Sequence, residues 1–167
     1  MTPRRRISAR SRLHLAGYVH VLARTDDVIN CAGHRLSSGA IEEVLSAHPD
    51  VAECAVIGAA DPLKGQVPVG LLVLSANATT TPDRVVADVV AAVRAEVGPV
   101  AAFRDAVVVE GLPRTRSGKT LRGVIQRIAD GEPYTLPGTI EDEAPVGMVA
   151  VALATIGYPR EQRECGG

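Results

Sequence analysis

The segment 51-VAECAVIGAADPLKGQVPVGLLVLS-75 holds two apolar stretches on either side of the turn-forming residues Asp61, Pro62 and Gly65. The first stretch alternates apolar and polar residues and then becomes almost continuously apolar, and the second is apolar over most of its length. Short runs of this kind, bounded by turn residues, are typical of strands. We therefore predict two successive strands that are joined by a loop.

Helical patterns flank these strands on both sides. Before them, Ser38 is a candidate N-cap for a helix over residues 39–48, which carries apolar residues on one face. After them, Thr81 is a candidate N-cap with Pro82 at the first helical position. A stripe of valines at helical spacing then predicts a helix over residues 82–97.

The rest of the chain supplies smaller elements. These are a strand and a hairpin over residues 17–37 with its turn at Ala32 and Gly33, a short strand at 105–110, a basic helix at 120–130, and a last helix at 145–157 that docks on the body. The expected fold is α+β, a small, mostly antiparallel sheet flanked by helices, with an N-terminal β-hairpin. We expect a basic flexible tail over residues 1–16, a domain over 17–130, and a linker with a C-terminal extension over 131–167.

Composition limits the classes of function. The chain has 167 residues, of which 46% are hydrophobic and 2% aromatic, so the core is aliphatic and offers few faces on which single-stranded nucleic acid could stack. The net charge of −1 favours neither a nucleic acid nor a membrane as partner. The cysteines Cys31, Cys54 and Cys165 have no metal-like spacing and are expected as free thiols in the cytoplasm. An Arg- and Ser-rich start could also resemble a mitochondrial transit peptide, but a tail explains it more simply.

The loop 112-LPRTRSGKT-120 groups Arg114, Arg116 and Lys119 with two small residues. A flexible ammonium on such a loop suits contact with an anion, although a solvated basic loop is the alternative. The ending SGKT resembles a phosphate-binding P-loop, but Pro113 stands where that motif has its first glycine. Proline removes a backbone N–H that would bind phosphate, which argues against an independent NTPase.

Four segments together resemble the C-terminal domain of acyl-CoA synthetases, in the adenylate-forming superfamily. They are ARTDDVINCAGHRLSSGAIEEVL, HPDVAECAVIGAADPLKGQVPVG, VRAEVGPVAAF and LPRTRSGKTLR, which begin at residues 23, 48, 93 and 112. Their spelling is closest to the acetyl- and propionyl-CoA synthetase branch, and the final stretch, residues 139–158, also resembles it. The sequence departs from the usual pattern at Ala23, Cys31, Arg114 and Thr120, none of which carries a proposed functional side chain.

The resemblance implies a two-step reaction in which ATP and an acid form an acyl-adenylate and CoA then displaces AMP to form a thioester. The small domain is a lid that rotates between two poses. Lys119 corresponds to the catalytic lysine of adenylation, and a lysine acetyltransferase and deacetylase are implied as regulators of it. The large N-terminal domain of the family is not in this sequence, so we expect it as a partner in trans or in a neighbouring frame.

The resemblance also implies roles for other residues. Arg24 and Arg35 correspond to ATP-binding arginines, and Asp26 to the hinge between the two domains. Ala32, Gly33 and Arg94 correspond to CoA-binding positions. Ser46, His48 and Val51 correspond to a cation site of some relatives, and the complete enzyme would use Mg²⁺. The alternative function is a stand-alone, non-catalytic module that binds CoA, a nucleotide or a protein.

Overall fold

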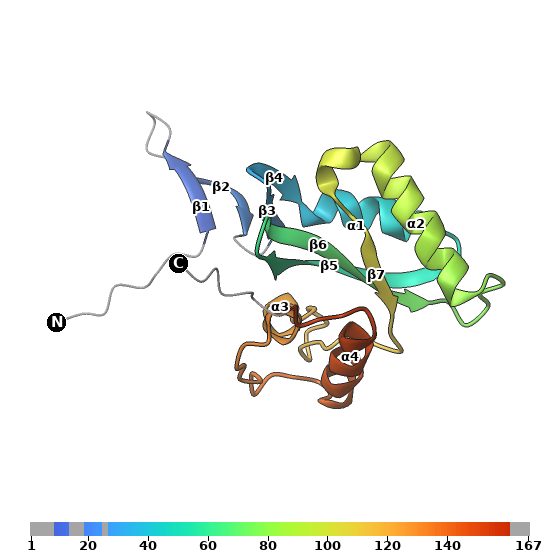
Figure 1. The fold of residues 1–167 in the computed structure, drawn as a ribbon. Coiled ribbons are helices and arrows are strands. Elements are labelled where there is room, and N and C mark those ends of the chain that lie inside the picture. Colours follow the sequence, from blue (N-terminus) through green and yellow to red (C-terminus); the bar gives the residue numbers. More distant parts are fainter. Residues whose placement is uncertain (1–8, 14–18, 25–26, 161–167) are drawn as a thin grey trace, which may run out of the picture.

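The computed structural model describes residues 9–13, 19–24 and 27–160 (Figure 1). Its strands are β1 (Ala9–Leu13), β2 (Val19–Arg24), β3 (Val28–Cys31), β4 (His34–Ser37), β5 (Val51–Asp61), β6 (Gly65–Leu74) and β7 (Asp105–Val108). Its helices are α1 (Ser38–Ser46), α2 (Pro82–Glu96), α3 (Arg122–Asp130) and α4 (Ala144–Thr155), with a short 3₁₀ turn, η2 (Pro99–Ala101).

The centre of the fold is the long hairpin of β5 and β6. These strands pair antiparallel from Val51 opposite Leu74 to Asp61 opposite Gly65. The other edge of β6 pairs with β3 at one end and with β7 further along, and β4 extends the sheet from β3. The predicted α+β fold with a mostly antiparallel sheet is therefore confirmed, and β7, which runs parallel to β6, is the exception.

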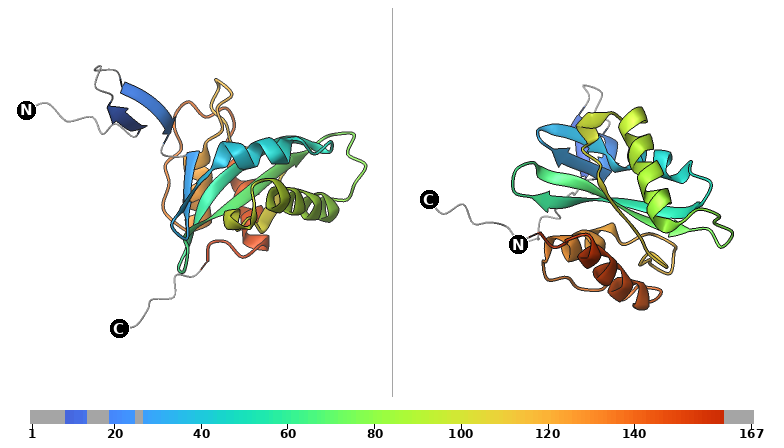
Figure 2. Two further views of the ribbon diagram at one scale, coloured as in Figure 1. Left: turned by 90° about the horizontal axis from the view of Figure 1, so that it is seen from above. Right: turned by 45° about the vertical axis from the view of Figure 1, so that its right-hand side comes forward.

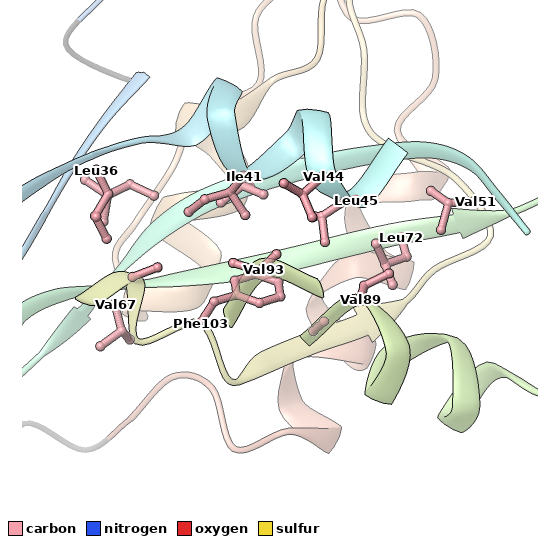
Figure 3. Close-up of a cluster of buried hydrophobic side chains, with 14 of the residues drawn as sticks. Leu36, Ile41, Val44, Leu45, Val51, Val67, Leu72, Val89, Val93 and Phe103 are labelled. Carbon is pink, nitrogen blue, oxygen red and sulfur yellow. The ribbon is translucent and has the colours of Figure 1, made fainter. Parts of the chain in front are cut away.

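Helices cover both faces of this sheet. Figure 2 shows α1 and α2 on one face and α3 and α4 on the other. The side chains of β5 alternate between the two layers, with Val56 in the cluster under α1 and α2 and its neighbours Ala55 and Ile57 in the cluster under α3 and α4. The apolar run in β5 is nearly continuous because the strand is buried on both faces. Figure 3 shows the α1 and α2 cluster, in which Leu45, Leu72 and Val93 meet.

The start of α1 lies one residue before the predicted position. The N-cap is Ser37, whose hydroxyl accepts a hydrogen bond from the N–H of Ala40 (3.3 Å). Ser38, predicted as the cap, is instead the buried first helical residue, and its hydroxyl donates to the carbonyl of Asp27 (3.3 Å). The predicted N-cap Thr81 of α2 is confirmed, with Pro82 directly after it.

The ends of the chain are more structured than the sequence indicated. Ala9–Leu13, inside the predicted tail, forms β1 and pairs with β2, because a backbone ladder requires a partner strand rather than an apolar pattern. The rest of that predicted tail lies outside the described residues. The predicted docking of the last helix is confirmed, since Val149 and Leu153 of α4 are buried against the sheet.

Gly70 allows the chain's single phenylalanine, Phe103, to pack closely against β6. A Cβ atom at Gly70 would lie 2.8 Å from Cζ of Phe103. Gly70→Ala is therefore expected to lower the free energy of unfolding by about 1–3 kcal/mol, because the buried ring must shift. Urea denaturation measures the change. The matched control is Gly147→Ala in α4, where the added atom meets nothing within 4 Å and should stabilise by up to about 1 kcal/mol. Equal effects of the two changes would contradict the prediction.

Candidate functional site

Lys119 ends a tight turn that precedes α3. The N–H of Thr115 donates to the carbonyl of Lys119 (2.9 Å), and the N–H of Gly118 donates back to the carbonyl of Thr115 (2.8 Å). Gly118 has a φ of +82°, which residues with a side chain rarely adopt. The Lys119 side chain is exposed and forms no ion pair with any described residue. A hydrogen-bonded turn thus presents an exposed, uncompensated ammonium.

The hydrogen bonds of this turn argue against a P-loop. The N–H groups of Thr115, Gly118 and Lys119 all donate within the turn, the last to the Thr115 hydroxyl (3.2 Å). A P-loop needs successive N–H groups that point at a phosphate. Because these donors are already used, the turn supports a role for the Lys119 side chain rather than for the backbone.

The predicted linker supports the Lys119 turn from outside. The N–H of Arg116 donates to the carbonyl of Thr139, and the N–H of Glu141 donates to the carbonyl of Arg114 (both 2.8 Å). A cavity of about 210 Å³ opens beside Lys119, and Thr139 is among its lining residues. Residues 137–141 therefore form part of the candidate site, which the Pro- and Gly-rich sequence did not indicate.

Ion pairs distinguish the cations of this region. Arg114 pairs with Glu53 of β5, and Arg122, at the start of α3, pairs with Glu42 of α1. Arg116, like Lys119, is exposed and forms no ion pair among the described residues. The basic loop seen in the sequence therefore contains both compensated and uncompensated charges, and Lys119 belongs to the uncompensated ones.

The hairpin turn between β3 and β4 places Ala32 and Gly33 at the surface. Both residues have positive φ angles, +49° and +82°, so the backbone takes the conformation of a tight hairpin turn. The N–H of Ala32 donates to the carbonyl of Lys64 (2.8 Å), which joins this turn to the neighbouring β5–β6 hairpin. A Cβ atom on Gly33 would meet nothing within 4 Å, so the space in front of the turn is open.

The candidate nucleotide and hinge residues are only partly described. Arg35 is exposed on β4. Arg24 ends β2, but its side chain lies outside the described residues, as does Asp26. Their predicted roles therefore stay predictions.

Arg94 lines a second cavity, of about 130 Å³, at the C-terminal end of α2. A second arginine, Arg104, lines the same cavity, and no acidic residue does. Neither arginine forms an ion pair with a described residue, and both are exposed. Sequence analysis missed Arg104, because only the turn through η2 brings it next to α2. The two cavities share no lining residue, so the Lys119 and Arg94 regions are separate sites.

His48 contacts two acidic residues, Asp50 and Asp88. Its Nδ1 accepts a hydrogen bond from the N–H of Asp50 (3.1 Å), which places the proton of a neutral ring on Nε2. Nε2 in turn lies 3.8 Å from a carboxylate oxygen of Asp88. The described residues contain no group of three His, Cys, Asp or Glu side chains fit to hold a metal. The cation site with Ser46 and Val51 stays a prediction, and no function is assigned to it.

Two of the cysteines are free thiols, as predicted. Cys31 is buried and Cys54 is partly buried. Burial, helped by the negative charge of Glu42, raises the pKa of Cys54 to about 11. This thiol therefore stays protonated at neutral pH and is a weak nucleophile.

Residues 40–119 match the protein family described as AMP-binding enzyme C-terminal domain. These residues are therefore similar to that domain family. The match begins in α1 and ends at Lys119, so it includes every lining residue of the Arg94 cavity, but only Thr115 and Lys119 of the residues that line the Lys119 cavity.

Two relatives of the chain are named as acyl-CoA synthetases. The chain is 52% identical over 137 residues to the mitochondrial acyl-CoA synthetase short-chain family member 3 of Homo sapiens, covering 82% of this chain and 20% of the relative. It is 42% identical over 140 residues to the acetyl-coenzyme A synthetase of Emericella nidulans, covering 84% of this chain and 21% of that relative. The chain thus spans about one fifth of the length of these relatives.

A solved structure agrees with the fold of this C-terminal domain. The acetoacetyl-CoA synthetase of Streptomyces lividans aligns with a TM-score of 0.67 at 22% identity, covering 89% of this chain and 22% of the other. Among the described helices, none has both the length and the apolar composition needed to cross a bilayer.

Proposed function

We propose that this chain serves as the lid domain of an AMP-forming short-chain acyl-CoA synthetase that acts on acetate or propionate. The observation that carries the proposal is the exposed, uncompensated ammonium of Lys119 on a hydrogen-bonded turn. The family match and the acyl-CoA synthetase relatives support it. A large N-terminal adenylation domain, in trans or from a neighbouring frame, supplies the acyl pocket.

In this proposal, Lys119 acts by charge. Negative charge shifts between the acid's carboxylate and the α-phosphate of ATP as the acyl-adenylate forms, and a fixed cation stabilises that change. One lysine without a substrate pocket supplies no proximity effect, so the isolated chain is expected to be inactive. Acetylation of Lys119 by a lysine acetyltransferase would remove the charge, and a deacetylase would restore it.

Other residues act in the same proposal at different steps. Arg24 and Arg35 bind the nucleotide, which enters with Mg²⁺, and Asp26 is the hinge. Ala32 and Gly33 border the pantetheine arm of CoA, with the open space before Gly33 as support. The protein acts in the cytoplasm.

Complementation tests the proposal. The chain is mixed with the large domain of a short-chain acyl-CoA synthetase, and exchange of pyrophosphate into ATP is measured with acetate and with propionate. The expected result is exchange that neither component shows alone. Full exchange by the large domain alone, with no gain from this chain, would contradict the proposal.

The cavity with Arg94 and Arg104 favours a second candidate function, in which the chain binds CoA by itself without catalysis. Arg94→Gln and Arg104→Gln are each expected to weaken CoA binding by about tenfold, because each guanidinium loses a charged hydrogen bond to phosphate. Isothermal titration calorimetry measures the affinity for CoA, and pantetheine serves as the comparison ligand without phosphates.

Arg84→Gln is the matched control, since Arg84 also lies on α2 but pairs with Asp88. Equal weakening by Arg84→Gln would contradict the site. Binding that survives Lys119→Ala, in a chain that never complements a large domain, would favour the second function.

A further inference from the structure

Arg122, which sequence analysis did not select, joins separate parts of the domain beside Lys119. Its Nε and Nη2 atoms donate to the carboxylate of Glu42, at distances of 3.1, 2.9 and 2.7 Å. Its Nη1 atom lies 3.7 Å from Oδ1 of Asp27. Arg122 is the first residue of α3, Glu42 lies in α1, and Asp27 directly precedes β3.

This contact is partly buried and has further support from the sheet. The exposed fractions of the side chains are 29% for Arg122 and 17% for Glu42. One oxygen of Glu42 also accepts the N–H of Val56 (2.8 Å), a buried residue of β5. The sheet therefore holds the carboxylate, and the planar guanidinium binds it by two nitrogens in a fixed orientation.

The position of Arg122 bears directly on Lys119. Only Thr120 and Leu121 separate the two residues, and both Lys119 and Arg122 line the 210 Å³ cavity together with Asp27. Movement of Arg122 would therefore shift the end of the Lys119 turn. The carboxylates also neutralise Arg122, so that it does not compete with Lys119 for an anion.

We propose that Arg122 is a positioning residue that fixes the Lys119 turn. Through Glu42 it holds the turn to α1 and β5, and through Asp27 it joins the turn to the residue that follows the predicted hinge, Asp26. The importance of Arg122 for catalysis rests on the proposed function. The contact itself acts within this chain, so it can be tested without a partner domain.

The two lysines of the chain, Lys64 and Lys119, provide the measurement. Labelling with ¹⁵N-lysine gives one backbone amide signal for each of them. The Lys119 N–H donates to the Thr115 hydroxyl (3.2 Å), inside the turn. The Lys64 N–H donates to Oδ1 of Asp61 (2.9 Å), and the other oxygen of Asp61 accepts a bond from Arg160 (2.8 Å). Each lysine amide therefore reports on a different arginine.

Arg122→Gln is expected to raise the hydrogen-exchange rate of the Lys119 amide by about tenfold, through local opening of the turn, and to leave the Lys64 amide unchanged. Arg160→Gln is the matched control. It should change the hydrogen-exchange rate of the Lys64 amide and leave that of the Lys119 amide unchanged. Glu42→Gln retains an acceptor for Val56 but loses the charge, and it should reproduce the effect of Arg122→Gln. Arg122→Lys keeps the charge without the fork, so it should restore part of the protection.

An unchanged Lys119 amide in Arg122→Gln, or an equal change at both lysines, would overturn the proposal. If Arg122→Gln does not fold, Arg122→Lys and Glu42→Gln decide the question by the same signals. A negative result would leave the proposed function standing, because that depends on the Lys119 side chain. Failure of the complementation test would in turn leave the hydrogen-exchange result for the Lys119 amide unaffected.

Discussion

Replacing Lys119 with alanine is expected to lower the rate of acyl-adenylate formation by about two to three orders of magnitude, as the loss of one fixed donor to developing charge typically does. The side chain is exposed and forms no ion pair among the described residues, so its removal should leave the fold intact. The measurement is pyrophosphate exchange in the complemented system, with unfolding by urea as a check on stability.

Lys64 makes a matched control for this prediction. It is the other lysine of the chain and lies in the β5–β6 hairpin, and it is absent from the residues that line the Lys119 cavity. Lys64→Ala should retain the exchange rate. Thioester formation from a separately prepared acyl-adenylate should also survive Lys119→Ala, because in the proposal a different face of the lid serves that step. Retained exchange in Lys119→Ala would exclude a catalytic role for its ammonium.

Replacing Gly33 with leucine is expected to slow thioester formation by about a hundredfold, the scale on which a misplacement of about 1 Å acts. The new side chain would fill the open space before the β3–β4 turn, where the proposal puts the pantetheine arm. Adenylation should change little, because Gly33 is not among the residues that line the cavity beside Lys119. The measurement is the single-turnover rate of CoA attack on a supplied acyl-adenylate.

Backbone strain is the competing explanation for such an effect. Gly33 has a φ of +82°, so any side chain there costs about 1 kcal/mol or more. Gly33→Ala carries the same strain with little bulk, and it should slow the thioester step much less than Gly33→Leu. If both variants slow the thioester step equally, the cause is strain in the turn rather than the bulk of the leucine side chain. Unimpaired thioester formation in Gly33→Leu would remove the turn from the CoA path.

The sequence supports these two predictions only in part. Lys119 and Gly33 were both selected from the sequence, through a resemblance spread over four segments. The structure adds that Lys119 is exposed and uncompensated and that the space before Gly33 is open. Neither property follows from spacing along the chain, since each depends on which segments pack nearby.

The local elements were predictable because they depend on short-range patterns. The continuous apolar run of β5 and the valine stripe of α2 each indicate one element, and the hairpin turn needs only Ala32 and Gly33. The N-cap of α1 was wrong by one residue, since Ser37 and Ser38 are both suitable caps and only packing decides which one is buried.

The sequence by itself predicted the α+β class and the order of the elements from β2 onward, and it singled out Lys119 as the candidate for the chemistry. The tertiary structure decided which cations are free to bind a ligand. Arg122 meets Glu42 across 80 residues and Arg114 meets Glu53 across 61, while Arg94 and Arg104 share a cavity only because η2 turns the chain back. Whether two charges compensate each other depends on the distance between them. For residues so far apart in the chain, the fold sets that distance, and local sequence patterns do not.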